Sequence, residues 1–141
     1  MTDLKFEEWK KEASKIIFRN KAFINGKFVD SISGKTFDSI NPASGEILTS
    51  VAECNEEDVS LAVTAARKAF QKGDWSKMPP SERKAVLLKL ADLIRSNLKE
   101  LALLDSLDMG KLVSDAVTID APGSAMFFQW HAEAIDKMYD E

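Results

Sequence analysis

The stretch FINGKFVDSISGKTFDSINPASGEILTSVAE, residues 23–53, decides the fold of the first part of the chain. Asn25-Gly26 separates two short apolar runs, and Asn-Gly readily takes the positive φ angles of a type I′ turn. The turn sequence at residues 41–45, Asn-Pro-Ala-Ser-Gly, separates two further strand-like segments. The strand after this second turn alternates, with one face formed by Ile47, Thr49 and Val51. The stretch predicts two consecutive β-hairpins, a scaffold that carries no catalytic group of its own.

The composition is that of an ordinary globular domain. The chain has 141 residues, of which 45% are hydrophobic and 30% charged, values that allow a buried core and argue against disorder. The formal net charge is −4, and no dense run of Lys or Arg occurs. Because nucleic acid is bound by concentrated basic surfaces, we expect no nucleic acid partner.

Three features of the sequence predict a cytoplasmic protein without a membrane partner. No apolar stretch approaches the roughly 18–20 residues that a membrane-spanning helix needs. The N-terminal sequence MTDLKFEEWKKEASK is charged where a secretion signal is continuously apolar. Cys54 is the single cysteine and cannot form an internal disulfide, which fits a reducing compartment.

Apolar residues at spacings of three and four predict helices before and after the hairpins. The expected helices span about residues 3–19, 55–73, 79–109 and 122–139, the third with a break at Ser96-Asn97 and Gly110 as its cap. We therefore expect an α+β chain, mostly helical, with N-terminal β-hairpins.

The helix at residues 55–73 has well-marked ends. Asn55 is a suitable N-cap, and Asp58 completes a capping-box-like exchange. Gly73 suits the C-terminal stop. The expected buried stripe consists of Val59, Ala62, Val63, Ala66, Ala69 and Phe70. The small alanines predict close packing against a sheet or another helix.

Several segments together resemble the N-terminal part of the aldehyde dehydrogenase superfamily. They are FINGKFVDSISGKTFDSINPASGEIL, EEDVSLAVTAARKAF, GDWSKMPPSERKAVLLKLADLI, LALLDSLDMGK and FFQWHAEAIDK, in the family's order and spacing. The resemblance covers nearly the whole chain. The Gly-Asp-Trp-Ser linker, the Trp-containing first helix and AEAIDKMY look most like the branch that acts on γ-glutamyl-γ-aminobutyraldehyde in putrescine degradation.

This resemblance implies an incomplete part of the aldehyde dehydrogenase α/β fold. By it, residues 1–20 form an N-terminal amphipathic helix, and residues 21–53 form the paired β-hairpin region. Residues 54–141 correspond to the helical part of the coenzyme-binding domain, without the dinucleotide-binding sheet and without the catalytic domain.

The family's chemistry resembles thiolate attack on an aldehyde, hydride transfer to NAD or NADP, and hydrolysis of the thioester. Its nucleophile lies in a Gly-Gln-x-Cys loop, its base in Glu-Leu-Gly-Gly-Lys, and its oxyanion-stabilising Asn in Pro-Trp-Asn-Phe. The sequence contains none of these motifs and no glycine-rich phosphate loop after a strand. We therefore assign no catalytic and no cofactor-binding residue, and we expect the chain by itself to bind neither NAD nor NADP.

The resemblance also suggests a monovalent cation site. In many family members, backbone carbonyls at positions matching Ile40 and Asp108 hold such an ion, with another ligand later in the chain. Carbonyl oxygens suit K⁺ or Na⁺. Because the later ligand is absent here, the predicted site would be incomplete.

Other residues with chemical potential have a structural interpretation. Cys54 precedes a helix start, but the acidic residues around it oppose a thiolate. His131 has no second His or Cys near it in sequence with which to build a zinc site. The carboxylate pairs Asp105/Asp108 and Asp136/Asp140 have helical spacing and fit solvated helix faces better than acid/base catalysis.

The tryptophans Trp9, Trp75 and Trp130 could stack on nucleic acid bases, but without clustered basic residues we expect core or interface packing.

Two hypotheses about function follow from these observations. In the first, the chain is the N-terminal fragment of an NAD(P)+-dependent aldehyde dehydrogenase and is inactive alone, whether through truncation or a frameshift. In the second, it is a structural or interaction module that exposes an apolar surface and self-associates or pairs with the remainder of a dehydrogenase chain. A free-standing α+β domain with another role is a third reading, for which the sequence offers no partner.

Overall fold

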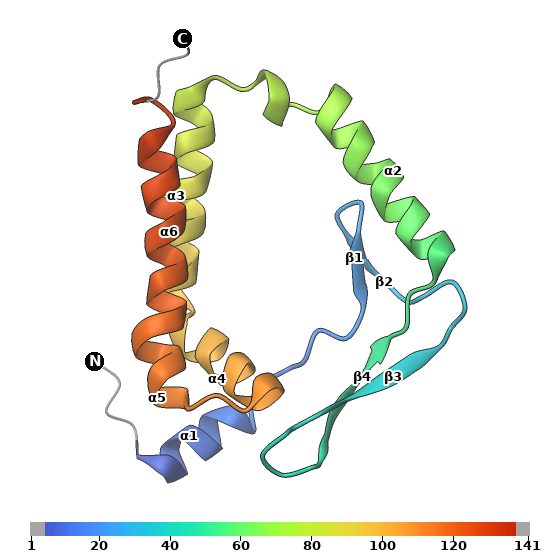
Figure 1. Ribbon diagram of the computed structural model, residues 1–141, viewed down its shortest axis with the longest axis vertical. Helices are drawn as coiled ribbons and strands as arrows, with labels where there is room; N and C mark the ends of the chain where they lie inside the picture. Colours follow the sequence, from blue (N-terminus) through green and yellow to red (C-terminus); the bar gives the residue numbers. More distant parts are fainter. Residues whose placement is uncertain (1–4, 138–141) are drawn as a thin grey trace. The chain divides into compact units, whose positions relative to one another are not determined.

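The computed structural model describes residues 5–137, which belong to two compact units (Figure 1). Residues 18–78 form the strand unit, which contains all four strands and one long helix. Residues 5–17 and 79–137 form the helical unit. This combination of small antiparallel strand pairs and a majority of helix confirms the predicted fold class. No helix among residues 5–137 is long and apolar enough to cross a bilayer.

The first hairpin pairs strand β1, Ala22–Ile24, with strand β2, Lys27–Val29. Its two loop residues both have positive φ, 51° at Asn25 and 77° at Gly26, which confirms the predicted turn. The rings of Phe23 and Phe28 lie 5.0 Å apart across the strands. The guanidinium of Arg19 lies 5.2 Å from the centroid of the Phe28 ring.

The second hairpin pairs strand β3, Thr36–Ile40, with strand β4, Ile47–Ala52. Its loop begins with an Asx turn, in which the Ala43 amide donates to Asn41 Oδ1 at 2.9 Å. The prediction that Ile47, Thr49 and Val51 share one face of β4 is wrong for Ile47. Thr49 and Val51 are half-buried, whereas Ile47 is exposed. The reason is a register shift opposite Ser39 and Ile40, which interrupts the alternation of the strand.

Helix α2, Glu56–Lys72, begins at the predicted N-cap. Asn55 Oδ1 accepts from the amides of Glu57 and Asp58, and Asp58 Oδ2 accepts from the Asn55 amide at 2.9 Å. This confirms the predicted capping box. The other oxygen of Asp58 accepts from the Ile32 amide at 3.0 Å, so the same carboxylate also fixes the loop between the hairpins.

The predicted burial of α2 is wrong. Val59, Val63 and Phe70, which belong to the expected buried stripe, are all exposed, Phe70 to 70%. Strand β1 and the short 3₁₀ turn η1, Trp75–Lys77, are the elements that chiefly contact α2. These small elements do not make a layer broad enough to cover the apolar side of a helix of 17 residues.

Gly73 ends α2 as predicted, but for a different reason. Its φ of −76° is not left-handed, so the residue is not needed for an unusual backbone angle. A Cβ at this position would lie 2.2 Å from the carbonyl oxygen of Ala69. The glycine is therefore required by the close approach of the backbone.

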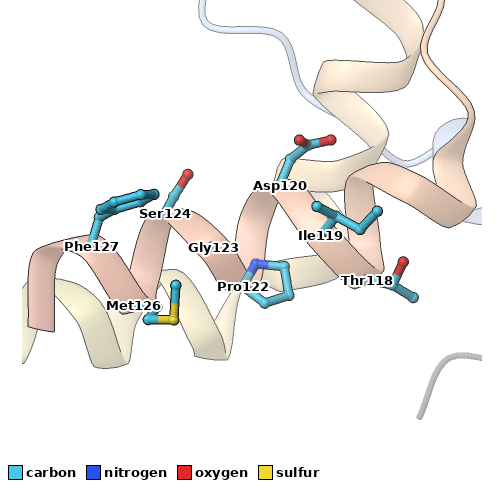
Figure 2. A pocket seen from close by; sticks show the side chains of 8 residues that line it. All are labelled: Thr118, Ile119, Asp120, Pro122, Gly123, Ser124, Met126 and Phe127. Atoms are coloured by element: carbon cyan, nitrogen blue, oxygen red, sulfur yellow. The ribbon is translucent and has the colours of Figure 1, made fainter. Parts of the chain in front are cut away.

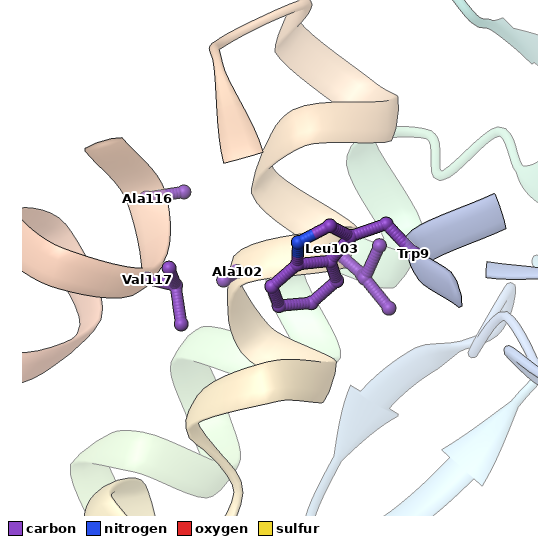
Figure 3. Close-up of a cluster of buried hydrophobic side chains, with 5 residues drawn as sticks. All are labelled: Trp9, Ala102, Leu103, Ala116 and Val117. Carbon is purple, nitrogen blue, oxygen red and sulfur yellow. The ribbon is translucent and has the colours of Figure 1, made fainter. Parts of the chain in front are cut away.

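The helical unit has a small core around Trp9, to which three elements contribute (Figure 3). Helix α1 spans Phe6–Ala13, and helix α4 spans Leu98–Met109. The core consists of Trp9, Ala102, Leu103, Ala116 and Val117. Helix α1 ends earlier than the predicted residue 19, since the chain turns after Ala13 with the Ser14 hydroxyl donating to the Lys11 carbonyl at 2.8 Å.

Helix α3, Pro80–Ser96, is separated from α4 at Asn97, as predicted. Pro80 occupies the first turn, where its missing N–H costs nothing. Gly110, with φ of 76°, caps α4 in the left-handed conformation, which is also as predicted.

The last helical segment begins earlier than the predicted residue 122. It consists of α5, Val113–Asp115, a five-residue π-helix η2, Ala116–Asp120, and α6, Ala121–Ala134. The last residue of the predicted helix, Tyr139, lies outside the described residues.

Helices α3 and α6 lie side by side and antiparallel (Figure 1). Lys84 pairs with Asp136 at 2.7 Å, and Arg95 donates to the side chain of Gln129. Both helices contribute fully buried alanines to the unit, which are Ala91, Ala125 and Ala132. Small side chains allow such helices to approach closely.

Candidate functional site

A hollow that carries polar groups lies along η2 and the start of α6 (Figure 2). Its volume is about 640 Å³, and its lining consists of Thr118, Ile119, Asp120, Pro122, Gly123, Ser124, Met126 and Phe127. All these residues come from one helical segment, so the hollow has a wall on one side only. Ligand sites usually enclose most of the ligand surface, which this hollow by itself cannot do.

Asp120 is the carboxylate of the hollow and is already engaged. Its Oδ2 lies 2.5 Å from the Nζ of Lys111, and about a third of each side chain is exposed. The hydrogen bond with Asp120 raises the pKa of Lys111 above its usual value. A carboxylate held in an ion pair is a poor general base. The hydroxyl of Thr118 is also engaged, since it donates to the Ser114 carbonyl at 2.6 Å.

Cys54 lies in the strand unit, exposed, between the end of β4 and the start of α2. Its sequence neighbours Glu53 and Glu56 are exposed acids, as the sequence indicated. His131 lies on the exposed side of α6, with its ring edge-on to Trp130 at 5.0 Å. Within residues 5–137, no three His, Cys, Asp or Glu side chains gather as metal ligands would.

The predicted carboxylate pairs do not form a joint site in the described residues. Asp105 is half-buried and Asp108 exposed on α4. Asp136 pairs with Lys84, whose ammonium group lowers the pKa of that carboxyl, and Asp140 lies outside the described residues. These environments are typical of structural ion pairs and helix surfaces.

The cation site suggested for Ile40 and Asp108 stays a prediction. Ile40 ends β3 in the strand unit, and Asp108 lies near the end of α4 in the helical unit. Each carbonyl therefore belongs to a different compact unit.

The three tryptophans differ in their environments. Trp9 is buried in the core of the helical unit, which confirms the packing expected for it. Trp75 and Trp130 are exposed, Trp130 to 63%. For these two, interface packing stays a prediction.

Comparison with known proteins decides the family. Residues 28–141 match the aldehyde dehydrogenase family, and this range is most of the chain. The chain belongs to the aldehyde dehydrogenase family. The resemblance seen in the sequence motifs is thereby confirmed, and the folded units are part of that family's fold.

Three relatives illustrate the match. Aminoacetaldehyde dehydrogenase of Pseudomonas aeruginosa is 47% identical over 134 residues, which are 95% of this chain and 27% of that protein. The structure of γ-glutamyl-γ-aminobutyraldehyde dehydrogenase from Burkholderia cenocepacia is 46% identical, with a TM-score of 0.95, over 98% of this chain and 28% of that one. The P. syringae indole-3-acetaldehyde dehydrogenase C302A mutant, in complex with NAD+ and IAA, is 44% identical with a TM-score of 0.95, again over 98% and 28%.

The chain thus spans about a quarter of the length of the curated relatives that it matches. The described hairpins and helices hold Cys54, exposed between β4 and α2, and His131, exposed on α6, in different compact units. Sequence reasoning missed the π-helix and the Lys111–Asp120 ion pair beside the hollow. No signal could have found the pair, because Lys and Asp nine residues apart are common on any surface.

Proposed function

We propose that this chain supplies the N-terminal scaffold of an NAD(P)+-dependent enzyme that oxidises aldehydes to carboxylic acids. In this proposal the 141 residues contribute packing surfaces, and the chemistry requires the remaining parts of a family member's fold. The observation that carries the proposal is the extent of the match: 95% of the chain aligns with 27% of an aldehyde dehydrogenase. The chain alone is then inactive, because its sequence contains neither the family's cysteine loop nor its base motif.

The exposed apolar surfaces support a role as scaffold. On α2, Val63 and Phe70 are exposed to more than half of their surface, and on α6 the same holds for Phe127 and Trp130. Large apolar side chains at such density are typical of surfaces that another part of a protein covers. The partner in this proposal is therefore the remainder of a dehydrogenase chain.

Relatives support a narrower substrate proposal. One relative is named for aminoacetaldehyde and another for γ-glutamyl-γ-aminobutyraldehyde, both of which carry nitrogen on the chain that bears the aldehyde. We propose the same class of aldehyde for the complete enzyme, with a place in putrescine degradation, in the cytoplasm, with NAD or NADP as acceptor.

A second candidate is an interaction module that associates with itself. It is favoured by the exposed side of α2, where Val59, Val63 and Phe70 follow one another at helical spacing. Size-exclusion chromatography of the chain, alone and mixed with the rest of a dehydrogenase, distinguishes the two candidates. A stable homo-oligomer that does not bind the rest of the dehydrogenase supports the interaction module.

A chimera tests the scaffold role. The matching 27% of the Pseudomonas aeruginosa aminoacetaldehyde dehydrogenase is replaced by this chain, and reduction of NAD+ by aminoacetaldehyde is followed by absorbance. We expect an active chimera, because the substituted segment brings packing surfaces and no catalytic group. A soluble, folded chimera without activity would contradict the proposal. The matched control is the same enzyme without its N-terminal segment, which we expect to be inactive.

A further inference from the structure

The helix that runs from Val113 to Ala134 contains one irregular turn, the π-helix η2. Its defining hydrogen bond joins the Ala121 amide to the Ala116 carbonyl, five residues back. Such a turn accommodates one more residue than an α-turn, and its hydrogen-bond geometry is less favourable. A π-turn in the middle of a helix therefore persists where other contacts stabilise it.

The π-turn changes which residues of the helix share a side. Ala116 is fully buried in the core around Trp9, and Ala121, five residues later, is also buried. In a regular α-helix each residue advances by about 100°, so two residues five positions apart point to nearly opposite sides. The i→i+5 bond lets one continuous helix bury both alanines.

The ion pair between Lys111 and Asp120 joins the end of η2 to the segment that precedes α5. Lys111 precedes α5, and Asp120 is the last residue of η2, with 2.5 Å between Nζ and Oδ2. Lys111 is itself fixed to α4, because the Ser106 hydroxyl donates to its carbonyl at 2.7 Å. The pair therefore ties the end of the π-turn to the preceding helix.

We infer that the Lys111–Asp120 ion pair is a conformational latch that keeps η2 in its π form. When the pair is broken, the turn loses its connection to α4, and the hydrogen bond from the Ala121 amide to the Ala116 carbonyl opens more often. Helix α6 itself stays packed on α3 through its buried alanines, so the change is confined to the turn. This inference concerns the chain itself and does not depend on the proposed enzymatic role.

The charges around Lys111 identify which partner matters. Asp120 lies within ion-pair distance of Lys111, with 2.5 Å between Nζ and Oδ2, whereas Asp105 and Asp115 are further from this ammonium group. Neutralising Asp120 therefore removes the contact that reaches η2. The remaining acids attract the ammonium group without connecting it to the turn.

The test is amide hydrogen exchange of the ¹⁵N-labelled full chain, read at the Ala121 amide. The variants are Lys111→Met, Asp120→Asn and the reversed pair Lys111→Asp/Asp120→Lys. The matched control is Lys84→Met, which breaks an ion pair of similar length between α3 and Asp136, away from the turn. For a pair that is only about one-third exposed, we expect exchange to rise roughly threefold to tenfold in both single variants.

The reversed pair should return the exchange of Ala121 to within about twofold of the parent chain, and the control should leave it unchanged. The inference is overturned if both single variants exchange within about twofold of the parent chain. It is also overturned if Lys84→Met raises exchange equally, since the effect would then be global. If Lys111→Met does not fold, Asp120→Asn tests the same pair with almost no change in shape.

Discussion

At the scale of the residue, Asp58 is a buried charged side chain that joins two parts of the strand unit. It is only 2% exposed, and its two oxygens accept from the amides of Asn55 and Ile32. One carboxylate thus caps α2 and fixes the loop between the hairpins. The capping role was predictable because it depends on a spacing of three residues. The bond to Ile32 was not, because it joins residues 26 apart.

Replacing Asp58 by Ala should therefore be costly. The change leaves the amides of Asn55 and Ile32 without this buried acceptor, and we expect the free energy of unfolding to fall by about 1–3 kcal/mol. Urea denaturation measures the loss. The neighbouring exposed Glu57→Ala is the control and should change the free energy by less than about 0.5 kcal/mol. Equal effects of the two variants would contradict the role of Asp58.

The Lys84–Asp136 pair predicts a dependence of stability on pH. The ammonium group of Lys84, through a hydrogen bond of 2.7 Å, lowers the pKa of the Asp136 carboxyl in the folded chain. Because this pKa is lower in the folded chain than in the unfolded chain, the ion pair stabilises the fold at pH values above the unfolded-state pKa of Asp136. This stabilisation is lost as the pH falls through the folded-state pKa of Asp136. The melting temperatures of the parent chain and Lys84→Met should differ at pH about 7 and converge at pH about 2. A difference that stays constant over this range would contradict the prediction.

At the scale of the element, the hairpin turns, the α2 cap, the break at Asn97 and the Gly110 cap could all be predicted. Each depends on residues within a few positions of one another, where backbone preference and local hydrogen bonds decide the conformation. The bulge in β4 and the π-turn η2 could not be predicted. Both are adjustments to partners distant in sequence, which local patterns do not contain.

Two glycines allow a matched prediction about helices. At Gly73 an added Cβ would lie 2.2 Å from the Ala69 carbonyl oxygen, whereas at Gly123, inside α6, nothing lies within 4 Å. We expect Gly73→Ala to destabilise the chain by about 1–3 kcal/mol. Gly123→Ala should stabilise it by about 0.5–1 kcal/mol, because alanine restricts the unfolded chain. Chemical denaturation measures the change in the free energy of unfolding of each variant, which should have opposite signs. If both changes had the same sign, the space described around one of the two glycines would be wrong.

At the scale of the whole molecule, the burial of apolar residues could not be predicted from periodicity. The pattern of α2 correctly predicts an amphipathic helix, but its apolar side is exposed in this chain. Periodicity reports which side of a helix is apolar and not whether a partner covers it. The exposed side of α2 is therefore consistent with the proposal that this chain packs against further parts of a dehydrogenase.

Charges placed on that side of α2 should alter surface properties without loss of stability. Val63→Glu/Phe70→Glu replaces two side chains that are exposed to 58% and 70%. We expect lower fluorescence of a bound hydrophobic dye such as ANS, and a change in unfolding free energy below about 0.5 kcal/mol. The exposed Gln71→Glu is the control for charge. A large loss of stability would mean that these side chains pack within the chain.

The central claim is that this aldehyde dehydrogenase segment is a scaffold without chemistry of its own. The direct measurement is the absorbance of NADH or NADPH when the purified 141-residue chain is mixed with aminoacetaldehyde and either NAD+ or NADP+. We predict no reduction above that of a mixture without protein, for the parent chain and for Cys54→Ser alike. Reduction by the parent chain that disappears in Cys54→Ser would contradict the claim.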